Sequence, residues 1–217
     1  MKPVIIIPAY NPPQLFNSLL QNIHTNISIP IIIIDDGSIP IIDLADNNTI
    51  LLRNENNSGK GFSLLRGFKE AFDRGYSHAI TMDADSQHDP NILQSFIEIS
   101  ENISIVLGNR QFNSNMPLHR RLSNKLTSAV ISCICHEQII DSQCGYRRYK
   151  LDNVCSETYM EHGFQFESEV LIKLLCNNCT LHNIEIPTIY GKEKSSMNNF
   201  CDTIKFIRLM IRCLIRI

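Results

Sequence analysis

The chain has 217 residues, of which 43% are hydrophobic and 19% charged, and its formal net charge at pH 7 is −2. This length provides one sizeable core, or one domain with a short appendage. The slightly acidic balance excludes a general nucleic-acid-binding protein, which would carry a strongly basic surface. An uncharged apolar stretch of about 18 residues is absent, so we expect no transmembrane helix. A strand-like run begins directly after residues 1–2, so we also expect no signal peptide and a cytoplasmic protein with reduced thiols.

Eight cysteines are more than is usual, and some have spacings that suit zinc. Cys133-Ile134-Cys135-His136 is one such cluster, and Cys176–Cys179 is a second pair, with His182 close behind. The first cluster lies in an apolar run, where free cysteine packs as a small hydrophobic residue. We therefore favour packing over zinc or redox chemistry.

Residues 1–110 alternate short Ile- and Val-rich runs with amphipathic segments. This alternation predicts βαβ units and an α/β fold, with a mostly parallel central sheet flanked by helices. The expected strands are 4–7, 31–34, 49–52, 78–82 and 103–107, and the expected helices lie near 13–26, 61–74 and 90–98.

The second half of the chain has a different pattern of predicted elements, but no linker divides it from the first half. It predicts a helix from about 119 to 135, a polar loop over 141–149 that enters a strand, a helix opening at 163–169 and a strand over 181–187. A basic loop follows at 191–196. We predict one domain over 1–199, with halves 1–110 and 111–199, and an amphipathic helix over 200–217.

Polar residues collect where the predicted parallel strands end. They form the segments 8–11, 35–38, 54 onward and 83–89. Ligands of open α/β sheets bind at the carboxyl ends of strands, so these segments indicate one composite site. The richest is Asp83-Ala84-Asp85-Ser86-Gln87-His88-Asp89, where the oxygen ligands suit Mg²⁺ or Mn²⁺. An Asp-rich turn that caps the next helix is the alternative.

Two common phosphate-binding motifs are missing from the sequence. No G-x-G-x-x-G follows the first strand and no G-x-x-x-x-G-K-[ST] occurs, so a dinucleotide site is not expected. Gly59-Lys60-Gly61 could instead open a helix whose N-terminus faces a phosphate. A plain helix start is the alternative interpretation.

Taken in order, the motifs resemble those of a family 2 glycosyltransferase with a GT-A fold. The matching segments cover nearly the whole chain; they are 7–11, 34–38, 57–61, 83–88, 108–110, 143–147, 164–167 and 184–187. The sequence is most similar to the soluble domain of dolichyl- or polyprenyl-phosphate mannosyltransferases. The resemblance implies inverting transfer of a sugar from a nucleotide-sugar to a membrane lipid phosphate, in envelope glycan or glycolipid synthesis.

The resemblance also implies roles for individual residues. Donor-side residues would be Pro8, Tyr10, Asn11, Asp36, Lys60, Asp83 and Ala84, with Lys192 and Lys194 in a loop that closes over the diphosphate. Asp83, Asp85 and Gln87 would ligate the metal ion. The acceptor would meet Arg110, Arg120, Arg121 and Arg147, because guanidinium groups suit phosphate. Pro12 stands where many relatives carry an acidic residue, which leaves the nucleotide preference open.

The catalytic residues depend on the acceptor. Asp85 would act through the metal. A phosphate acceptor is already anionic and needs no strong base, whereas a hydroxyl acceptor needs a carboxylate beside it. Asp141 and Glu167 are the candidates for that carboxylate, although Glu167 could also cap its helix or pair with Arg147. A soluble transferase using a saccharide or small-molecule hydroxyl, and a non-catalytic nucleotide-sugar-binding subunit, are the alternative functions.

The last predicted helix has an unusual distribution of charge. On a helical projection of residues 201–217, four basic residues form a narrow stripe and apolar residues fill the rest. Such a helix suits a bilayer interface with anionic lipids, and we expect contact with the cytoplasmic face of a membrane or with a partner subunit. A terminal helix packed on the core is the alternative.

Overall fold

The structure is a computed structural model. It describes residues 1–44, 49–111, 118–187, 189 and 199–216, without the side chains of 119, 120, 199–202 and 214–216. The predictions for Lys192, Lys194 and the Arg120 side chain fall outside this description.

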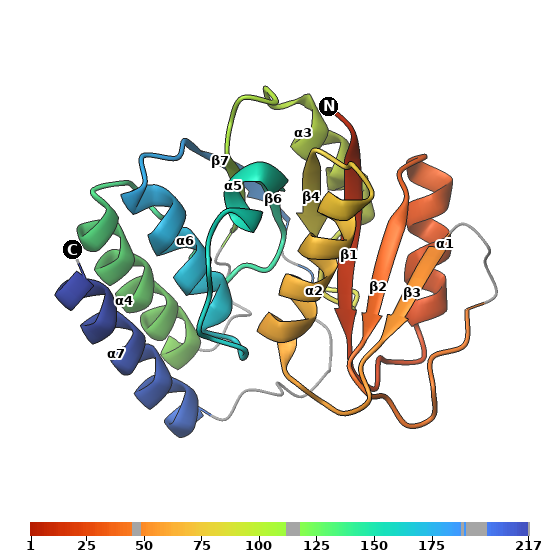
Figure 1. Cartoon of the computed structure of the whole chain (residues 1–217), viewed down its shortest axis with the longest axis horizontal. Coiled ribbons are helices and arrows are strands. Elements are labelled where there is room, and N and C mark those ends of the chain that lie inside the picture. Colours follow the sequence, from red (N-terminus) through yellow and green to blue (C-terminus); the bar gives the residue numbers. More distant parts are fainter. Residues whose placement is uncertain (45–48, 112–117, 188, 190–198, 217) are drawn as a thin grey trace.

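A central sheet runs through the molecule (Figure 1). Within the described residues it has seven strands in the order β3-β2-β1-β4-β6-β5-β7. Every pairing is parallel except those of β6, which runs antiparallel to both β4 and β5. The strands are β1 (Pro3–Ala9), β2 (Ile31–Asp35), β3 (Thr49–Arg53), β4 (His78–Thr81), β5 (Ile105–Arg110), β6 (Arg147–Lys150) and β7 (Leu181–Ile186). The expectation of a mostly parallel sheet is confirmed.

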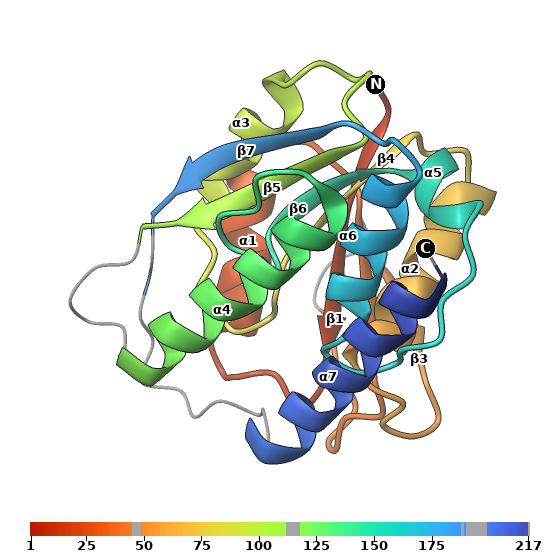
Figure 2. The same ribbon diagram turned by 90° about the vertical axis from the view of Figure 1, so that its left-hand side faces the viewer.

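The helices lie on both faces of this sheet (Figures 1 and 2). One face carries α1 (Phe16–Asn26), the 3-10 helix η1 (Pro90–Ile92) and α3 (Leu93–Glu98). The other carries α2 (Lys60–Asp73), α4 (Leu118–Cys135), α5 (Leu151–Cys155), α6 (Phe166–Cys176) and α7 (Asn199–Arg216). Among these helices, the short α5 is the one that the sequence did not predict.

The first two strands explain why the sheet is covered on both sides. Alternate residues of a strand point to opposite faces, and Ile5 and Ile7 pack in one hydrophobic core while Val4 and Ile6 pack in the other. All four are fully buried. Strands buried on both faces read as continuous apolar runs, which is the pattern that residues 4–7 and 31–34 show.

Helix α2 packs very closely on the sheet because Gly67 lies at the contact. A Cβ atom at residue 67 would come within 2.6 Å of Ile6 Cγ2 and 2.8 Å of Ile34 Cδ1. The close approach fixes the position of α2 and therefore of its first residue, Lys60.

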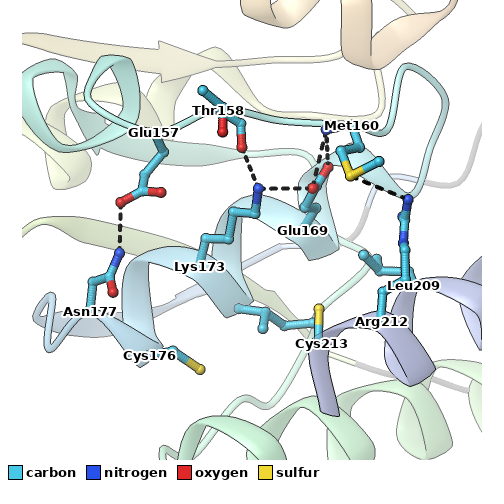
Figure 3. Close-up of a pocket in the computed structure, with 11 residues that line it drawn as sticks. Glu157, Thr158, Met160, Glu169, Lys173, Cys176, Asn177, Leu209, Arg212 and Cys213 are labelled. Atoms are coloured by element: carbon cyan, nitrogen blue, oxygen red, sulfur yellow. Dashed lines mark hydrogen bonds and ion pairs between the residues drawn. The ribbon is translucent and has the colours of Figure 1, made fainter. Parts of the chain in front are cut away.

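Helix α7 is attached to the domain and does not project from it. Leu209 and Met210 are buried in the same core as α2 and α6. Arg212 forms an ion pair with Glu161, and its Nη1 lies 3.7 Å from the sulfur of Met160 (Figure 3). Within the described part of the chain, no helix combines the length and hydropathy that crossing a bilayer requires.

A cavity of about 300 Å³ lies between α6, α7 and the 157–160 segment (Figure 3). Its polar groups are paired with one another. Glu169 accepts hydrogen bonds from the N–H groups of Met160 and Glu161 and lies 3.1 Å from the ammonium of Lys173. We therefore interpret the cavity as a gap in the packing between α6 and α7 and not as a ligand site.

Candidate active site

The polar segments of the sequence meet at one edge of the sheet. The carboxyl ends of β1, β2, β4 and β5 all point to this edge, and β6 begins there because it runs antiparallel. Thr81 pairs with Arg147 across β4 and β6, and Leu107 pairs with Arg147 across β5 and β6. The end of β4, the end of β5 and the Gly145 turn thus lie next to one another.

Asp36, predicted on the donor side, holds the loop that leads into α2. Its carboxylate accepts hydrogen bonds from the N–H groups of Ser58 (3.0 Å) and Gly59 (2.8 Å) and from the side-chain amide of Asn54 (2.7 Å). Gly59 has φ +100°, and a Cβ there would lie 2.5 Å from the carbonyl oxygen of His162. Asp36 is buried, so it orders the donor side of the site from beneath.

The end of β1 contributes a second part of the donor side. Asn11, at φ 44°, accepts a hydrogen bond from the Ile39 N–H (2.8 Å) through its side chain and donates its own N–H to Ser38 Oγ (2.9 Å). Pro8 is half-buried, whereas the Tyr10 side chain is 52% exposed. The Tyr10 ring is therefore available to a ligand at this strand end.

The acidic motif follows β4 and turns back on itself. Asp85 Oδ1 accepts a hydrogen bond from the Gln87 N–H (3.0 Å), and Ser86 between them has φ 60°. Asp83, Ala84, Asp85 and Gln87 are half-buried. Among the described residues, Ser86 Oγ is a buried polar atom with no hydrogen-bond partner.

The oxygen ligands of this turn fit a hard divalent cation. Asp83 and Asp85 supply carboxylates and Gln87 an amide oxygen, the ligand types that Mg²⁺ and Mn²⁺ take. Across the described ranges, three His, Cys, Asp or Glu side chains do not converge on one point as a closed metal cage. Mg²⁺ is usually held by one or two carboxylates together with substrate phosphates, so a closed cage is not required.

Lys60 links the acidic motif to α6. Its Nζ atom lies 2.7 Å from Asp83 Oδ1 and 2.9 Å from Glu167 Oε2. Burial lowers the pKa of Lys60, but the two carboxylates outweigh it and raise the pKa above its ordinary value. For Asp83, burial acts to raise the pKa, but the charges of Lys60 and His88 outweigh burial and lower the pKa to about 2. Lys60 and Asp83 are thus both charged at neutral pH.

Gly145 leaves room in front of these charges. A Cβ atom there would lie 2.8 Å from Asp83 Oδ2 and 3.0 Å from Lys60 Nζ. The backbone is held in place by Thr81, whose hydroxyl donates to the Gly145 carbonyl (2.7 Å). Only glycine keeps this space open.

His88 supports the acidic motif from the buried side. Its Nδ1 accepts the Asp83 N–H at 3.2 Å, and its ring stacks on Tyr146 with the centroids 4.9 Å apart. Burial lowers the pKa of His88 to about 4, although Asp83 acts in the opposite direction. The imidazole is neutral at pH 7, as its acceptor role requires.

The acceptor side is built around Arg110. Its Nε lies 2.7 Å from Asp141 Oδ2 and its Nη2 lies 3.0 Å from Asp141 Oδ1, so the two side chains form a bidentate ion pair. Asn124 of α4 donates to Asp141 Oδ1 at 2.6 Å, and the Gln143 N–H does so at 3.2 Å. Asp141 is fully buried, whereas the Arg110 side chain keeps 23% of its surface exposed.

One of the predicted acceptor contacts, Arg147, has a different environment in the structure. Arg147 is fully buried, and its guanidinium donates to the carbonyls of Cys144 (2.6 Å), Ser142 (2.7 Å) and Glu167 (2.8 Å). It ties the 141–146 loop to α6, so a direct contact with the acceptor is not retained. Arg121 lies half-buried on α4.

Three supporting residues were not predicted from the sequence to have a role. They are Asn124, Gly145 and His88. His88 and Gly145 lie inside segments that matched the family, which was a signal that they belong to the site. Asn124 lies in a polar helix face with nothing in the sequence to distinguish it.

A doubly covered, mostly parallel sheet with an Asp-x-Asp turn at its carboxyl edge defines the class of nucleotide-sugar-dependent transferases with the GT-A fold. The chain belongs to glycosyl transferase family 2, because the model of that family matches residues 4–165. It is accordingly a glycosyltransferase, and the non-catalytic interpretation is not retained.

Individual relatives agree with this assignment. The chain is 29% identical over 213 residues to the UDP-N-acetylglucosamine–dolichyl-phosphate N-acetylglucosaminyltransferase of Methanococcus voltae, covering 86% of this chain and 85% of the relative. It is 23% identical over 208 residues to the polyprenol monophosphomannose synthase of Mycolicibacterium smegmatis, covering 88% and 78%.

A solved structure shows the same fold. Glucosyl-3-phosphoglycerate synthase of Mycobacterium tuberculosis, in complex with Mn²⁺, UDP-glucose and phosphoglyceric acid, superposes with a TM-score of 0.72. The match covers 98% of this chain and 79% of that one at 14% sequence identity. The GT-A architecture expected from the motifs is thereby confirmed.

Proposed function

We propose that the protein transfers a sugar, with inversion, from a nucleotide-sugar to a lipid phosphate of the polyprenyl-phosphate class. One observation carries the choice of acceptor. The carboxylate beside the acceptor side, Asp141, is fully buried and bound to Arg110, Asn124 and Gln143. A guanidinium and not a free base therefore faces the acceptor.

The state of Asp141 matters because it separates the two classes of acceptor. A hydroxyl must lose a proton as it attacks, and a carboxylate that acts as its base needs a free oxygen and a pKa near the working pH. Burial raises the pKa of Asp141, but its hydrogen bonds and charge contact with Arg110 lower it below the ordinary value. A phosphate acceptor is already ionised and gains instead from the guanidinium.

On the donor side, Tyr10 would contact the nucleoside and Asp36 would hold the loop before α2 in place. Asp83, Asp85 and Gln87 would hold Mg²⁺ or Mn²⁺ against the donor diphosphate. When bound, the cation would stabilise the negative charge that the leaving diphosphate gains. Lys60 keeps the Asp83 carboxylate ionised and fixed in direction.

A hydroxyl acceptor is the alternative, and one feature favours it. Glu167 Oε1 is a buried atom without a hydrogen-bond partner among the described residues, so it could accept a proton. Its other oxygen is held by Lys60 at 2.9 Å. In that case Glu167 would act as the base.

Acceptor dependence of turnover separates these functions. Purified protein with Mn²⁺ and a panel of nucleotide-sugars is assayed with polyprenyl phosphate, with the matching polyprenol, and with soluble sugars. The proposal predicts lipid-linked sugar from polyprenyl phosphate alone. With a phosphate acceptor, the Glu167→Gln variant keeps most of the transfer to polyprenyl phosphate. If Glu167 is the base for a hydroxyl acceptor, the variant loses the transfer to that hydroxyl.

We also propose that the protein works at a membrane surface, with α7 as the contact. Three isoleucines of α7 remain about half exposed although the helix packs on the core; they are Ile204, Ile207 and Ile211. A lipid acceptor requires such a location. The contact with a partner subunit, expected as the alternative, has no comparable support.

A further inference from the structure

The outer face of α4 carries a row of exposed leucines. Leu118, Leu122 and Leu126 follow one another at four-residue spacing, and their side chains are 78%, 70% and 64% exposed. Residues four apart lie on the same face of a helix, so the three form one stripe. Single exposed leucines are ordinary, but a continuous apolar stripe indicates a surface that binds something.

Helix α7 carries a second stripe. Ile204, Ile207 and Ile211 are 52%, 52% and 53% exposed, while Leu209 and Met210 on the other side of the helix are buried. Leu209 and Met210 therefore provide the apolar contact between α7 and the core. The three exposed isoleucines are more apolar surface than this contact requires.

The two helices lie side by side on the same outer side of the molecule, as both views show (Figures 1 and 2). Val130 and Ile134 of α4 and Phe206 of α7 pack against one hydrophobic core, so the helices share their inner support. We name the six exposed residues, Leu118, Leu122, Leu126, Ile204, Ile207 and Ile211, the α4–α7 surface.

The exposed charged side chains that the structure describes on α4 and α7 are positive. Lys125 on α4 and Lys205 and Arg208 on α7 are exposed beside the stripes. The sequence of α4 has no acidic residue, and that of α7 has one, Asp202. A second copy of the chain would bring basic groups against basic groups, which opposes association. Anionic lipid headgroups complement both the cations and the apolar stripes.

The inner face of α4 reaches the acceptor side of the site. Asn124 is fully buried and donates its side-chain amide to Asp141, which holds Arg110. A helix with its side chains is about 10–12 Å across. A bilayer in contact with the leucines would therefore lie roughly one helix diameter from the Asp141–Arg110 pair.

We propose that the α4–α7 surface docks on an anionic lipid bilayer and so places Arg110 near the depth of the headgroups. This inference rests on the proposed lipid phosphate acceptor and extends it. It assigns the docking to two helices, with α4 as the element that joins the membrane to the acceptor side, and not to α7 alone.

The test is co-sedimentation of the full chain with vesicles of phosphatidylcholine, with or without phosphatidylglycerol. The variants are Leu122→Gln/Leu126→Gln on α4, Ile207→Gln on α7, and Lys125→Glu. Matched controls are Leu15→Gln, an exposed leucine (62%) before α1, and Lys69→Glu, an exposed lysine on α2. Thermal unfolding confirms that each variant is folded.

The proposal predicts binding that needs phosphatidylglycerol. We expect the double leucine variant to lose about tenfold or more in vesicle affinity, with the two controls unchanged. Equal binding of the α4 variants and the parent protein would overturn the proposal. So would a parent protein that sediments as a dimer, turns monomeric with Leu122→Gln/Leu126→Gln and ignores vesicles.

Vesicle binding requires neither donor nor acceptor, so its outcome is independent of the proposed reaction. If the transferase activity is directed at soluble hydroxyls but vesicle binding follows the α4 variants, the docking surface stands and the acceptor proposal fails. If a detergent-solubilised polyprenyl phosphate is glycosylated equally well by the parent protein and by α4 variants that bind vesicles normally, the acceptor proposal stands and the surface fails.

Discussion

The ammonium of Lys60 lies 2.7 Å from Asp83 Oδ1 and 2.9 Å from Glu167 Oε2, and so joins the first residue of α2 to the end of β4 and the start of α6. A half-buried lysine between two carboxylates neutralises part of their charge and sets their direction. The donor side of the site is thus assembled before any ligand is present.

Replacing Lys60 by methionine removes this central cation. The two carboxylates are left close together and unpaired, and because Lys60 and Asp83 are only partly buried, the loss of stability should lie below the roughly 3–5 kcal/mol of a fully buried ion pair. We expect a lower melting temperature for Lys60→Met without metal, and a larger rise on addition of Mn²⁺ than the parent protein shows. Thermal unfolding with and without Mn²⁺ measures both.

The control for this change is Lys69→Met, since Lys69 is exposed on the same helix. A similar loss of stability in both variants would show that Lys60 contributes through helix propensity and not through Asp83 and Glu167.

Gly145→Ala tests the space in front of Asp83. The added Cβ would lie 2.8 Å from Asp83 Oδ2 and 3.0 Å from Lys60 Nζ, and both are ends of side chains that can shift. We expect folding stability to change by less than about 1 kcal/mol, and metal-dependent turnover to fall by at least about tenfold. Gly75→Ala is the control. An added Cβ at residue 75 would meet nothing within 4 Å, but the φ of +74° is one that alanine rarely adopts.

Gly75→Ala should therefore lose some stability and keep its turnover. If Gly145→Ala retains turnover like that of the parent protein, then the open space beside Asp83 has no role in the reaction.

Asp85→Asn removes one carboxylate from the acidic turn. Asp85 is half-buried, and its Oδ1 accepts the Gln87 N–H, a bond that the asparagine oxygen can also accept. We expect activity to be abolished while the melting temperature without metal changes little. Turnover within a few-fold of the parent value would contradict a role in metal binding; Asp73→Asn, at an exposed position, is the matched control.

Asp141→Asn tests the support of Arg110. Asp141 has a pKa below its ordinary value, so it binds fewer protons in the folded than in the unfolded protein. Its contribution to stability is then present above the unfolded pKa, near 4, and is lost as the pH falls through the folded pKa. We expect the parent protein to be more stable than the variant at pH 7, with the difference shrinking below about pH 4.

A constant difference in stability between pH 7 and pH 3 would show that Asp141 is not ionised in the folded protein. With a phosphate acceptor, the same variant should raise KM for the acceptor more than it lowers kcat, because Arg110 loses its alignment.

Much of the framework was predictable because local sequence decides it. Fully buried parallel strands need apolar residues on both faces, so a continuous apolar run such as 31–34 can be recognised as a strand from the sequence. Parallel strands also bring their carboxyl ends together, which predicts that Asp36 and Asp83 lie at one edge of the sheet.

The charged pairs inside the site were not predictable in the same way. Lys60 and Glu167 are far apart in the sequence, and their contact depends on how α2 and α6 pack on the sheet. The family resemblance implied an acceptor contact for Arg147, but the carbonyls that accept hydrogen bonds from its guanidinium come from its own loop and from α6. Periodicity and motif carry no information on such contacts.

The central claim is that a phosphate on a lipid is the acceptor and that Arg110 binds it. The most direct measurement compares initial rates of sugar transfer to polyprenyl phosphate and to the unphosphorylated polyprenol, for the parent protein and for Arg110→Gln. The account predicts transfer to the phosphate alone, and a large increase in KM for it in Arg110→Gln. Equal rates with the polyprenol, or an unchanged KM in the variant, would contradict it.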